Sequence, residues 1–451
     1  MTAPEAGSQT PPTPTWRESL AVYLQPRVLI VMMLGFSSGL PLALSGSTLL
    51  VWMRESGVDL GTIGLFALVG TPYTLKFLWA PLVDALHVPF FTRAFGRRRG
   101  WLVFSQLLLI GSILLLAITD PARSPLFVAL GALLVATMSS TQDIVVDAFR
   151  VESLPESEQA AGMASYVAAY RIGMLVSTAG ALFIVTGFQN TGLEPGAAWM
   201  WGYVVMAALV LVGTVTALVA TEPEQSARAE AATRSESAFS RVLHAAIGAF
   251  SEFLTRRDAF AALAFVVLFK FTDAFSGTMT APFVIDLGFT RNDYAAIVKG
   301  VGLAATLIGG FAGGFVARRY SLAASLWIGG VLQAVANLSF SWLAMVGVNQ
   351  WALGFAITAE NFTSAIGTVI FVAYLSALCQ NPLHTATQYA LLTALAAVGR
   401  TYLSSGAGYV AKATGWPLFF AICVLVAIPS LILLAWLQRR GHFDKLGPVK
   451  V

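Results

Sequence analysis

Charged residues are scarce in this chain of 451 residues: only 11% are Asp, Glu, Lys or Arg, whereas 57% are hydrophobic. An ordinary soluble domain has about 25% charged and about 45–50% apolar residues. A soluble protein of this length would need roughly three domains. The 27 basic and 23 acidic side chains are too few to cover their surfaces. The shortage excludes a disordered chain and a basic nucleic-acid-binding protein, and it indicates an outer surface that faces lipid.

Cysteine is nearly absent too. Cys379 and Cys423 are the only two, which excludes a disulfide framework and a cysteine metal cluster. The four histidines lie at the ends of apolar runs or in polar segments, without the paired spacing of a metal site: His87, His244, His384 and His442. There is no phosphate-binding loop and no nucleophile elbow. We therefore expect neither an enzyme nor a cofactor, and energy must come from a gradient.

Long apolar runs are abundant instead. A helix needs about 20 predominantly apolar residues to cross the hydrocarbon core of a bilayer. The chain has twelve such runs, at about 27–52, 61–83, 101–119, 125–147, 162–187, 199–221, 259–283, 294–317, 322–347, 351–378, 384–411 and 416–438. Prolines inside or at the ends of these runs predict kinks at Pro41, Pro72, Pro81 and Pro282.

The predicted organisation has five parts: a tail at 1–25, a six-helix half at 26–221, a linker at 222–258, a second half at 259–438 and a tail at 439–451. The first tail is rich in Pro, Thr and Ser and lacks the apolar core of a signal peptide, so we expect a disordered cytoplasmic segment. In the linker, apolar residues recur at helical spacing across 239–253. They predict an amphipathic helix, either along the membrane surface or packed on the ends of the spans.

Basic residues orient the predicted spans, because they accumulate on the cytoplasmic side. One set of loops and both tails hold most of the Lys and Arg residues outside the spans. The opposite set of loops holds only Arg54, Arg123, Arg291 and Lys412. We therefore expect both termini and the linker in the cytoplasm.

Two segments resemble each other across the halves. RESGVDLGTIGLFALVG (Arg54–Gly70) follows the first predicted span, and IDLGFTRNDYAAIVKG (Ile285–Gly300) follows the seventh. Two six-helix halves in parallel repeat are the plan of the major facilitator fold, which binds substrate between the halves near the midplane of the membrane. The expected fold class is thus an all-α polytopic membrane protein with twelve transmembrane helices in pseudo-two-fold repeat.

Several charged side chains remain inside the predicted spans, where each costs about 2.5–3.5 kcal/mol at a helix centre. A water-filled cavity with paired charges offsets that cost. The basic residues concerned are Lys76, Arg171, Lys270, Lys299 and Arg400. Near the midplane lie three of these bases, Arg171, Lys270 and Arg400, and two acids, Asp273 and Glu360. This excess of positive charge favours an anionic ligand, and Arg binds carboxylates in bidentate fashion.

For some of these bases the residues leave alternatives open. Arg171 and Arg400 occupy related places in the two halves, so we expect both to contact the substrate. Lys270 and Asp273 share a helix face and could instead form a buried ion pair that joins two helices. Lys299 could be a residue that extends toward the membrane surface.

Three acids within the spans are candidates for proton coupling: Asp143, Glu360 and Asp273. A carboxylate in a poorly solvated site can gain and lose a proton as a cavity opens to either side. Asp273 has a lysine neighbour, whereas Asp143 and Glu360 have no opposite charge within a turn of their own helices. The alternative for these two is an ion pair with a base on another helix.

At the predicted cytoplasmic ends, Asp84, Asp147 and Arg150 are candidates for a charge network that latches the halves in one state. A solvated rim is the alternative. The segment PLVDALHVPFFTRAFGRRRG (Pro81–Gly100) resembles the loop signature of the major facilitator superfamily, with a longer interval before its glycine.

Several segments in combination resemble the AmpG-type muropeptide permeases of Gram-negative inner membranes, and the resemblance extends from about residue 25 to 437. They are LGFSSGLPLALSGSTLLVWM (Leu34–Met53), LVGTPYTLKFLWAPLVD (Leu68–Asp84), FGRRRGW (Phe95–Trp101), STQDIVVDAFRVESLPESEQAAG (Ser140–Gly162), YRIGMLVS (Tyr170–Ser177), LFKFTDAF (Leu268–Phe275), ENFTSAIGT (Glu360–Thr368) and ATQYALLTALAAVGR (Ala386–Arg400).

The resemblance implies proton-driven import of anhydromuropeptides, which are sugar peptides released during cell-wall turnover, and a link to β-lactamase induction. It also implies site residues by their positions. Gln142 and Asp143 match the family's Gln–Asp pair, and further polar positions match Arg171, Lys270, Asp273, Glu360 and Arg400. Candidate partners for sugar hydroxyls are Gln142, Asn361, Tyr170 and Gln388, and Lys76 completes the predicted substrate-binding set. We expect a monomer that needs only substrate, protons and lipid.

Two other functions compete with this hypothesis. The same fold could carry another anionic solute, such as an acetyl-CoA-type thioester. A membrane receptor or scaffold without transport activity is the third possibility, although the linker is too short to hold a folded soluble domain.

Overall fold

A computed structural model describes residues 21–223, 258–378 and 385–446, and every element in these ranges is helical. The predicted amphipathic helix at 239–253 and nearly all of the first tail lie outside the described residues, as does Cys379. The side chains of Asp84 and Gln388 also lie outside them.

The first half contains all elements up to residue 219. They are η1 (Val22–Leu24), α2 (Pro26–Leu44), α3 (Ser47–Glu55), α4 (Leu60–Leu65), η2 (Phe66–Gly70), α5 (Thr71–Leu75), η3 (Lys76–Leu78), α6 (Ala80–Ala85), α7 (Phe91–Phe95), α8 (Arg97–Ala117), α9 (Pro125–Ser153), α10 (Glu156–Leu175), η4 (Val176–Gly180), α11 (Ala181–Asn190) and α12 (Pro195–Val219).

The second half begins at residue 259. Its elements are α15 (Ala259–Asp286), α16 (Arg291–Asp293), η5 (Tyr294–Val301), α17 (Gly302–Arg319), α18 (Leu322–Val346), α19 (Gln350–Leu378), α20 (Thr385–Tyr402), η6 (Leu403–Gly406), α21 (Ala407–Thr414), α22 (Trp416–Arg439) and η7 (Phe443–Lys445).

Ten helices in the described ranges are long and apolar enough to cross a membrane. The other two predicted runs, 61–83 and 384–411, are helical but interrupted. Pro72 and Pro81 lie at the starts of α5 and α6, where proline is tolerated because the first helical N–H groups have no intrahelical acceptor. In the second run the chain tightens to the 3-10 helix η6 before α21 begins. The observed elements are compatible with twelve crossings.

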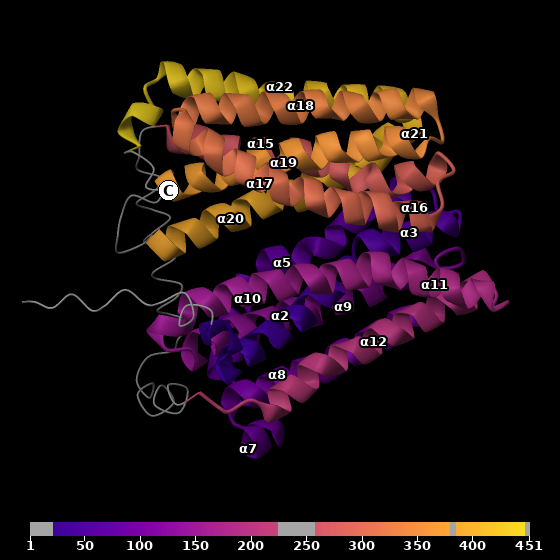
Figure 1. The fold of residues 1–451 in the computed structure, drawn as a ribbon, viewed down its shortest axis with the longest axis vertical. Helices are drawn as coiled ribbons and strands as arrows, with labels where there is room; N and C mark the ends of the chain where they lie inside the picture. Colours follow the sequence, from indigo (N-terminus) through magenta and orange to yellow (C-terminus); the bar gives the residue numbers. More distant parts are fainter. Residues whose placement is uncertain (1–20, 224–257, 379–384, 447–451) are drawn as a thin grey trace, which may run out of the picture.

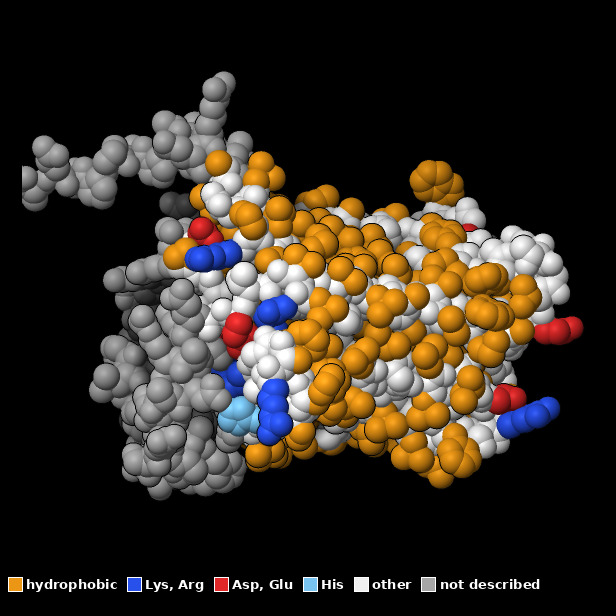
Figure 2. Space-filling view, turned by 90° about the horizontal axis from the view of Figure 1, so that it is seen from below, with side chains coloured by type: hydrophobic (Ala, Val, Ile, Leu, Met, Phe, Trp, Pro, Cys, Tyr) orange, Lys and Arg blue, Asp and Glu red, His pale blue; other side chains and the backbone are white. Residues whose placement is uncertain are grey.

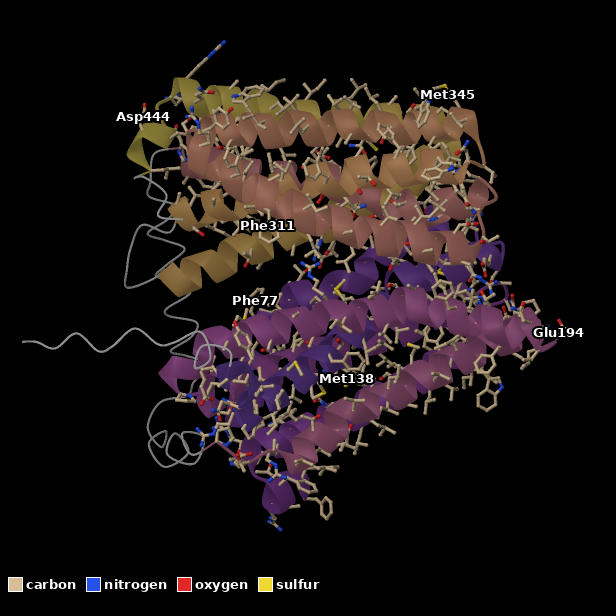
Figure 3. All side chains as sticks on the ribbon, in the orientation of Figure 1. Phe77, Met138, Glu194, Phe311, Met345 and Asp444 are labelled. Atoms are coloured by element: carbon tan, nitrogen blue, oxygen red, sulfur yellow. The ribbon has the colours of Figure 1, made fainter. Side chains whose placement is uncertain are left out.

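The two halves lie side by side as two bundles of roughly parallel helices (Figure 1). Figure 1 shows the end of α12 and the start of α15 at one end of the molecule, together with the end of α22. We name this the proximal end, and we name the opposite end, where α11 and α16 lie, the distal end. Asp444 and Glu194 mark these two ends in Figure 3.

The outer surface is apolar between the two ends. On the face shown in Figure 2, hydrophobic side chains cover the middle of the molecule, and charged side chains gather at either end. Large exposed residues include Phe311, Trp351 and Ile432. Because helices satisfy their own backbone hydrogen bonds, such a surface can face lipid.

Glycine allows α2 and α10 to touch. A Cβ atom on Gly35 would lie 2.6 Å from the Tyr166 carbonyl oxygen, closer than real Cβ atoms approach. Small residues at such contacts let helix backbones pack directly. The contact fixes α10, which carries Tyr170 and Arg171, against the first helix.

The internal repeat is visible in the turns after the first and seventh crossings. Gly57 and Gly288 both have positive φ, of 80° and 98°, a conformation that glycine adopts without steric cost. Each is followed by a side chain that caps the next helix: Asp59 accepts from the N–H groups of Gly61 and Thr62, and Thr290 accepts from the N–H of Asp293.

Candidate functional site

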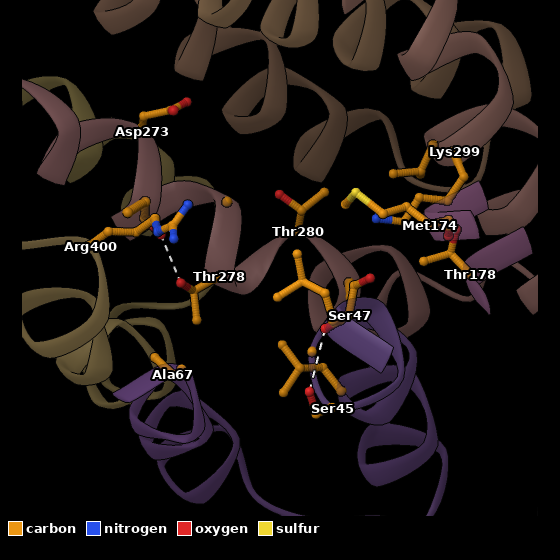
Figure 4. Close-up of a pocket in the computed structure, with 18 of the residues that line it drawn as sticks. Ser45, Ser47, Ala67, Met174, Thr178, Asp273, Thr278, Thr280, Lys299 and Arg400 are labelled. Atoms are coloured by element: carbon orange, nitrogen blue, oxygen red, sulfur yellow. Dashed lines mark hydrogen bonds between the residues drawn. The ribbon is translucent and has the colours of Figure 1, made fainter. Parts of the chain in front are cut away.

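A cavity of about 570 Å³ lies between the two halves (Figure 4). Both halves supply its walls, including Phe66 and Tyr73 from the interrupted second crossing and Thr278 and Thr280 from α15. The volume falls within the usual range for a small-molecule site.

The two walls differ in polarity. The first half contributes mainly apolar side chains, hydroxyl groups and one charge, Arg171. The second half contributes four charged side chains, Asp273, Lys299, Glu360 and Arg400. The polar part of any ligand therefore finds most of its partners on the second half.

Three bases around the cavity have no counter-ion among the described residues. Within the described part of the chain, no carboxylate forms an ion pair with Arg171, Lys299 or Arg400. Lys299 Nζ lies 5.4 Å from the ring centroid of Tyr294, and Arg171 and Arg400 are exposed to the cavity. Uncompensated cations in a cavity attract an anionic ligand.

Lys270 and Asp273 form the ion pair that their spacing allows, with Nζ and Oδ2 2.8 Å apart. Thr368 accepts a second bond from Lys270 at 3.0 Å, and Ser364 donates to the other Asp273 oxygen at 2.6 Å. Asp273 lines the cavity and Lys270 does not. Through these bonds to Thr368 and Ser364, the pair joins α15 to α19. Lys270 lies directly next to the cavity, because its partner Asp273 lines it.

The other predicted substrate ligands lie in different surroundings. Asn361 lines the cavity and accepts from the Thr306 hydroxyl at 3.2 Å. Gln142 is fully buried and donates to Ser38 at 3.2 Å. Tyr170 packs beside Tyr166, with ring centroids 6.0 Å apart. Neither Gln142 nor Tyr170 is among the lining residues.

The two candidate acids for proton coupling that have no charged neighbour on their own helices also differ. Glu360 lines the cavity, and its carboxylate has no ion pair or hydrogen bond with the described residues. Asp143 lies outside the lining and is only 7% exposed, and its Oδ1 atom lacks a hydrogen-bond partner in the described ranges. Both are therefore carboxylates without full compensation.

The predicted latch residues pair inside the first half. Asp147 lies 3.9 Å from Lys76 Nζ and 3.7 Å from the Arg150 guanidinium, which also lies over the Tyr166 ring. Asp84 is on α6, but its side chain is not described. In this conformation, no described contact joins Asp147 or Arg150 to the second half.

The halves are joined by charges at the distal end, which sequence reasoning missed. Arg291 of the second half enters a socket formed by Glu55, Gln189 and Trp199 of the first half. Its Nε and Nη2 atoms donate to the two Glu55 oxygens at 2.8 and 2.7 Å, and Nη1 donates to Gln189 at 2.8 Å. The guanidinium lies 5.5 Å from the Trp199 ring centroid. We name these three partners the Arg291 socket.

Further distal contacts accompany the Arg291 socket. Arg54 pairs with Asp286, and Lys412 lies 3.4 Å from Asp59. The Thr62 hydroxyl, 2.5 Å away, is the main cause that holds the pKa of Asp59 below its ordinary value, and Lys412 adds to it. The loops predicted to face the periplasm hold only four bases, and three of them, Arg54, Arg291 and Lys412, form these contacts between the halves. The rarity of bases in these loops could have identified them as candidates for such contacts.

Backbones also meet across the halves at the distal end. A Cβ atom on Gly64 of α4 would lie 2.8 Å from the backbone nitrogen of Gly408 in α21. Glycine at both positions permits this contact. The distal ends of the halves are therefore closed by ion pairs and by direct backbone packing.

Comparisons with known proteins place the chain in a family. The profile of the Major Facilitator Superfamily matches residues 31–404. The chain is 38% identical to the Anhydromuropeptide permease of Escherichia coli (strain K12), over 95% of this chain and 83% of that protein. It is 35% identical to Putative transporter AmpG 4 of Rickettsia felis, over 92% of this chain and 97% of that protein.

Solved structures agree on the fold. The nucleoside transporter NupG (D323A mutant) superposes with a TM-score of 0.69, covering 92% of this chain and 99% of that one at 12% identity. A D-xylose–proton symporter gives 0.66, covering 91% and 97%, also at 12% identity. These likenesses confirm the predicted all-helical fold class. The chain belongs to the Major Facilitator Superfamily, in its AmpG group, and is a multi-pass membrane transporter rather than an enzyme.

Proposed function

We propose that this protein imports anhydromuropeptides from the periplasm to the cytoplasm by proton-coupled transport. The relative from Escherichia coli is an anhydromuropeptide permease and aligns over nearly the whole chain. The observation that carries the proposal is the cavity with three bases, Arg171, Lys299 and Arg400, that have no carboxylate partner in the described ranges. A muropeptide brings peptide carboxylates, which guanidinium groups bind in bidentate geometry.

The rest of the cavity suits the sugar part of such a ligand. Asn361, Thr278 and Thr280 offer hydrogen-bonding groups for hydroxyls and acetamido groups. Phe66 and Tyr73 offer apolar surface for the ring faces. The other predicted ligands are Gln142, Tyr170, Lys76, Lys270 and Gln388. The first four are not among the residues that line the cavity, so they can contact the ligand only if movement of the halves exposes them.

We further propose that the proximal end faces the cytoplasm of a Gram-negative cell, with the protein in the inner membrane. The excess of basic residues at the predicted cytoplasmic loops supports this orientation. The distal closure then makes this the inward-facing conformation. In the opposite conformation, Asp84, Asp147 and Arg150 would latch the halves at the cytoplasmic end. A monomer suffices, because one chain supplies both walls of the cavity.

Asp143 and Glu360 are the proposed carriers of the coupled proton. Intramembrane carboxylates without a fixed counter-ion are typical of proton relays. Asp273 is the weaker candidate, because Lys270 and Ser364 already bind its two oxygens. An Asp143→Asn variant is expected to block accumulation against a gradient while it still permits exchange.

Uptake into proteoliposomes tests the proposal. We expect labelled anhydromuropeptide to accumulate under an inward proton gradient, and a protonophore to stop accumulation. Arg171→Ala and Arg400→Ala should abolish uptake at unchanged membrane insertion. Uptake that persists with the protonophore would remove the proton coupling, and full activity of both Arg variants would make the basic centre structural.

A carrier of another anionic solute is the second candidate, because three bases without an ion partner in the described ranges suit any ligand with several negative charges. Competition separates the two. If a coenzyme A thioester displaces the labelled ligand and anhydro-sugars do not, the acetyl-CoA-type function replaces the muropeptide function.

A further inference from the structure

Lys299 reaches the cavity because its helix departs from α geometry. It lies on η5, a π-helix from Tyr294 to Val301, in which residues five apart share hydrogen bonds and a face. Tyr294 and Lys299 are five residues apart, and the lysine ammonium lies over the tyrosine ring. In an α-helix the neighbours on one face are three or four residues apart. The π-helix thus brings both side chains to the same wall.

A second π-helix faces the first one across the halves. It is η4 of the first half, which contacts η5 directly. Thr178 on η4 and Met174 just before it line the cavity beside Lys299 (Figure 4). Non-α segments of this kind are rare and occur often at functional sites. Lys299 therefore belongs to a local structure that both halves build.

Lys299 and Arg400 stand apart. Figure 4 shows Arg400 with Thr278 on one side of the pocket and Lys299 with Met174 on the other, with Thr280 between them. Neither base has an ion partner within the described residues. One carboxylate cannot contact two bases at opposite sides of a cavity. Two separate anionic groups can.

We propose that Lys299 is a specificity-determining residue that binds a second anionic group of the ligand, at the opposite side of the cavity from Arg400. This inference rests on the proposed function. Arg400 takes the first carboxylate, because a guanidinium binds it in bidentate fashion, whereas the ammonium of Lys299 acts as a point charge. The preferred ligand therefore carries at least two carboxylates that are separated along its length.

Two ligands separate the roles of the two bases. A peptide-free anhydro-disaccharide has one carboxylate, on its lactyl group, and the peptide-bearing form has more than one. Uptake of both is measured in proteoliposomes with the full chain and with Lys299→Met. The KM of the peptide-bearing ligand should rise about tenfold, as expected for a lost charge-assisted contact. The KM of the peptide-free ligand should stay within about twofold, since it does not use that contact.

Two further variants complete the design. Lys299→Arg keeps the positive charge and should restore most of the affinity for the peptide-bearing ligand, which distinguishes charge from packing. Arg123→Met removes a base whose side chain is 88% exposed and which, in the part of the chain that the structure describes, pairs with its neighbour Asp120, so it should change neither KM. Thermal unfolding of each purified variant checks that it is folded.

The outcomes are distinct. If Lys299→Met raises both KM values equally, Lys299 acts through the overall positive electrostatic potential of the cavity and not through one contact, and the inference is overturned. It is overturned as well if neither KM changes. If the unchanged protein transports neither ligand, the proposed function fails first.

Discussion

The two ends of the molecule use their charges differently. At the proximal end, charges tie the first half together: Arg98 binds Glu152 at 2.6 Å, and Glu222 accepts the backbone N–H groups of Arg98 and Arg99 at 2.8 and 3.0 Å. At the distal end, Arg291 and its socket connect one half to the other. The proximal pairs therefore stiffen a six-helix unit, whereas the distal pairs hold a closure that has to open.

This difference indicates rigid halves that move about the cavity. Reciprocal capping supports the rigidity, because Arg99 donates to the carbonyls of Ala217 and Leu218 at the end of α12, while Glu222 caps the start of α8. Such contacts do not change when one half rotates against the other. Contacts between the halves do change, so they contribute to the balance between conformations.

Removal of the Arg291 side chain from its socket should have the largest effect on the closure of the distal end. Arg291→Ala removes one member of a mostly buried ion pair, and such truncations cost about 2–5 kcal/mol. The cost falls on the distal-closed state, so the distal-open state should become more populated. Thr178→Cys, in a chain with Cys379 and Cys423 replaced by alanine, reports the change through labelling by a membrane-impermeant reagent from the distal side.

Retained protection of that cysteine would contradict the role of the socket. Arg123→Ala is the matched control, because Arg123 is also a distal base but pairs within its own half. It should leave the labelling rate unchanged.

A methyl group at Gly408 should have the next largest effect. A Cβ atom there would collide with the backbone of Leu60 in the other half, whereas nothing lies within 4 Å of a Cβ atom on Gly406. Gly408→Ala should therefore increase distal labelling and lower uptake, and Gly406→Ala should do neither. Equal behaviour of the two variants would show that backbone packing does not hold the closure.

The proposed latch at the proximal end predicts that Arg150→Ala decreases distal labelling, whereas Arg291→Ala increases it, and that its effect is of intermediate size. Arg150 pairs with Asp147 inside the first half in this conformation. If it also latches the other conformation, Arg150→Ala should destabilise the distal-open state. In the Arg291→Ala background it should then lower the labelling of Thr178→Cys. Unchanged labelling would instead assign Arg150 to a solvated rim, and increased labelling would contradict the latch.

Much of the fold could be predicted because a bilayer requires long apolar helices, and hydropathy reports them directly. The spacing of Lys270 and Asp273 likewise predicted a shared face, since i,i+3 neighbours on a helix meet. The pairing of Glu55 with Arg291 could not be read from the chain, because helical periodicity does not identify contacts between distant helices.

Lys299 shows a second limit. Its α-helical register gave no reason to place it with Tyr294, and only the π-helix η5 does so. The interruptions in the second and eleventh crossings have a similar cause, because local turns there replace regular hydrogen bonds. Non-α segments depend on tertiary contacts more than on propensity.

The most exposed of the ion pairs that join the halves in the described ranges should have the smallest effect. Lys412 is 62% exposed and lies 3.4 Å from Asp59, and exposed pairs contribute about 0–1 kcal/mol. Lys412→Met should raise distal labelling of Thr178→Cys slightly in low salt and not measurably in high salt. Because the Thr62 hydroxyl is the main cause of the low pKa of Asp59, the variant should keep most of that shift. Any stabilisation by ionised Asp59 is present above its ordinary pKa of 3.8 and disappears as the pH falls through the lowered value. A salt-independent effect of Lys412→Met as large as that of Arg291→Ala would mean that exposed charges, and not the buried socket, close the distal end.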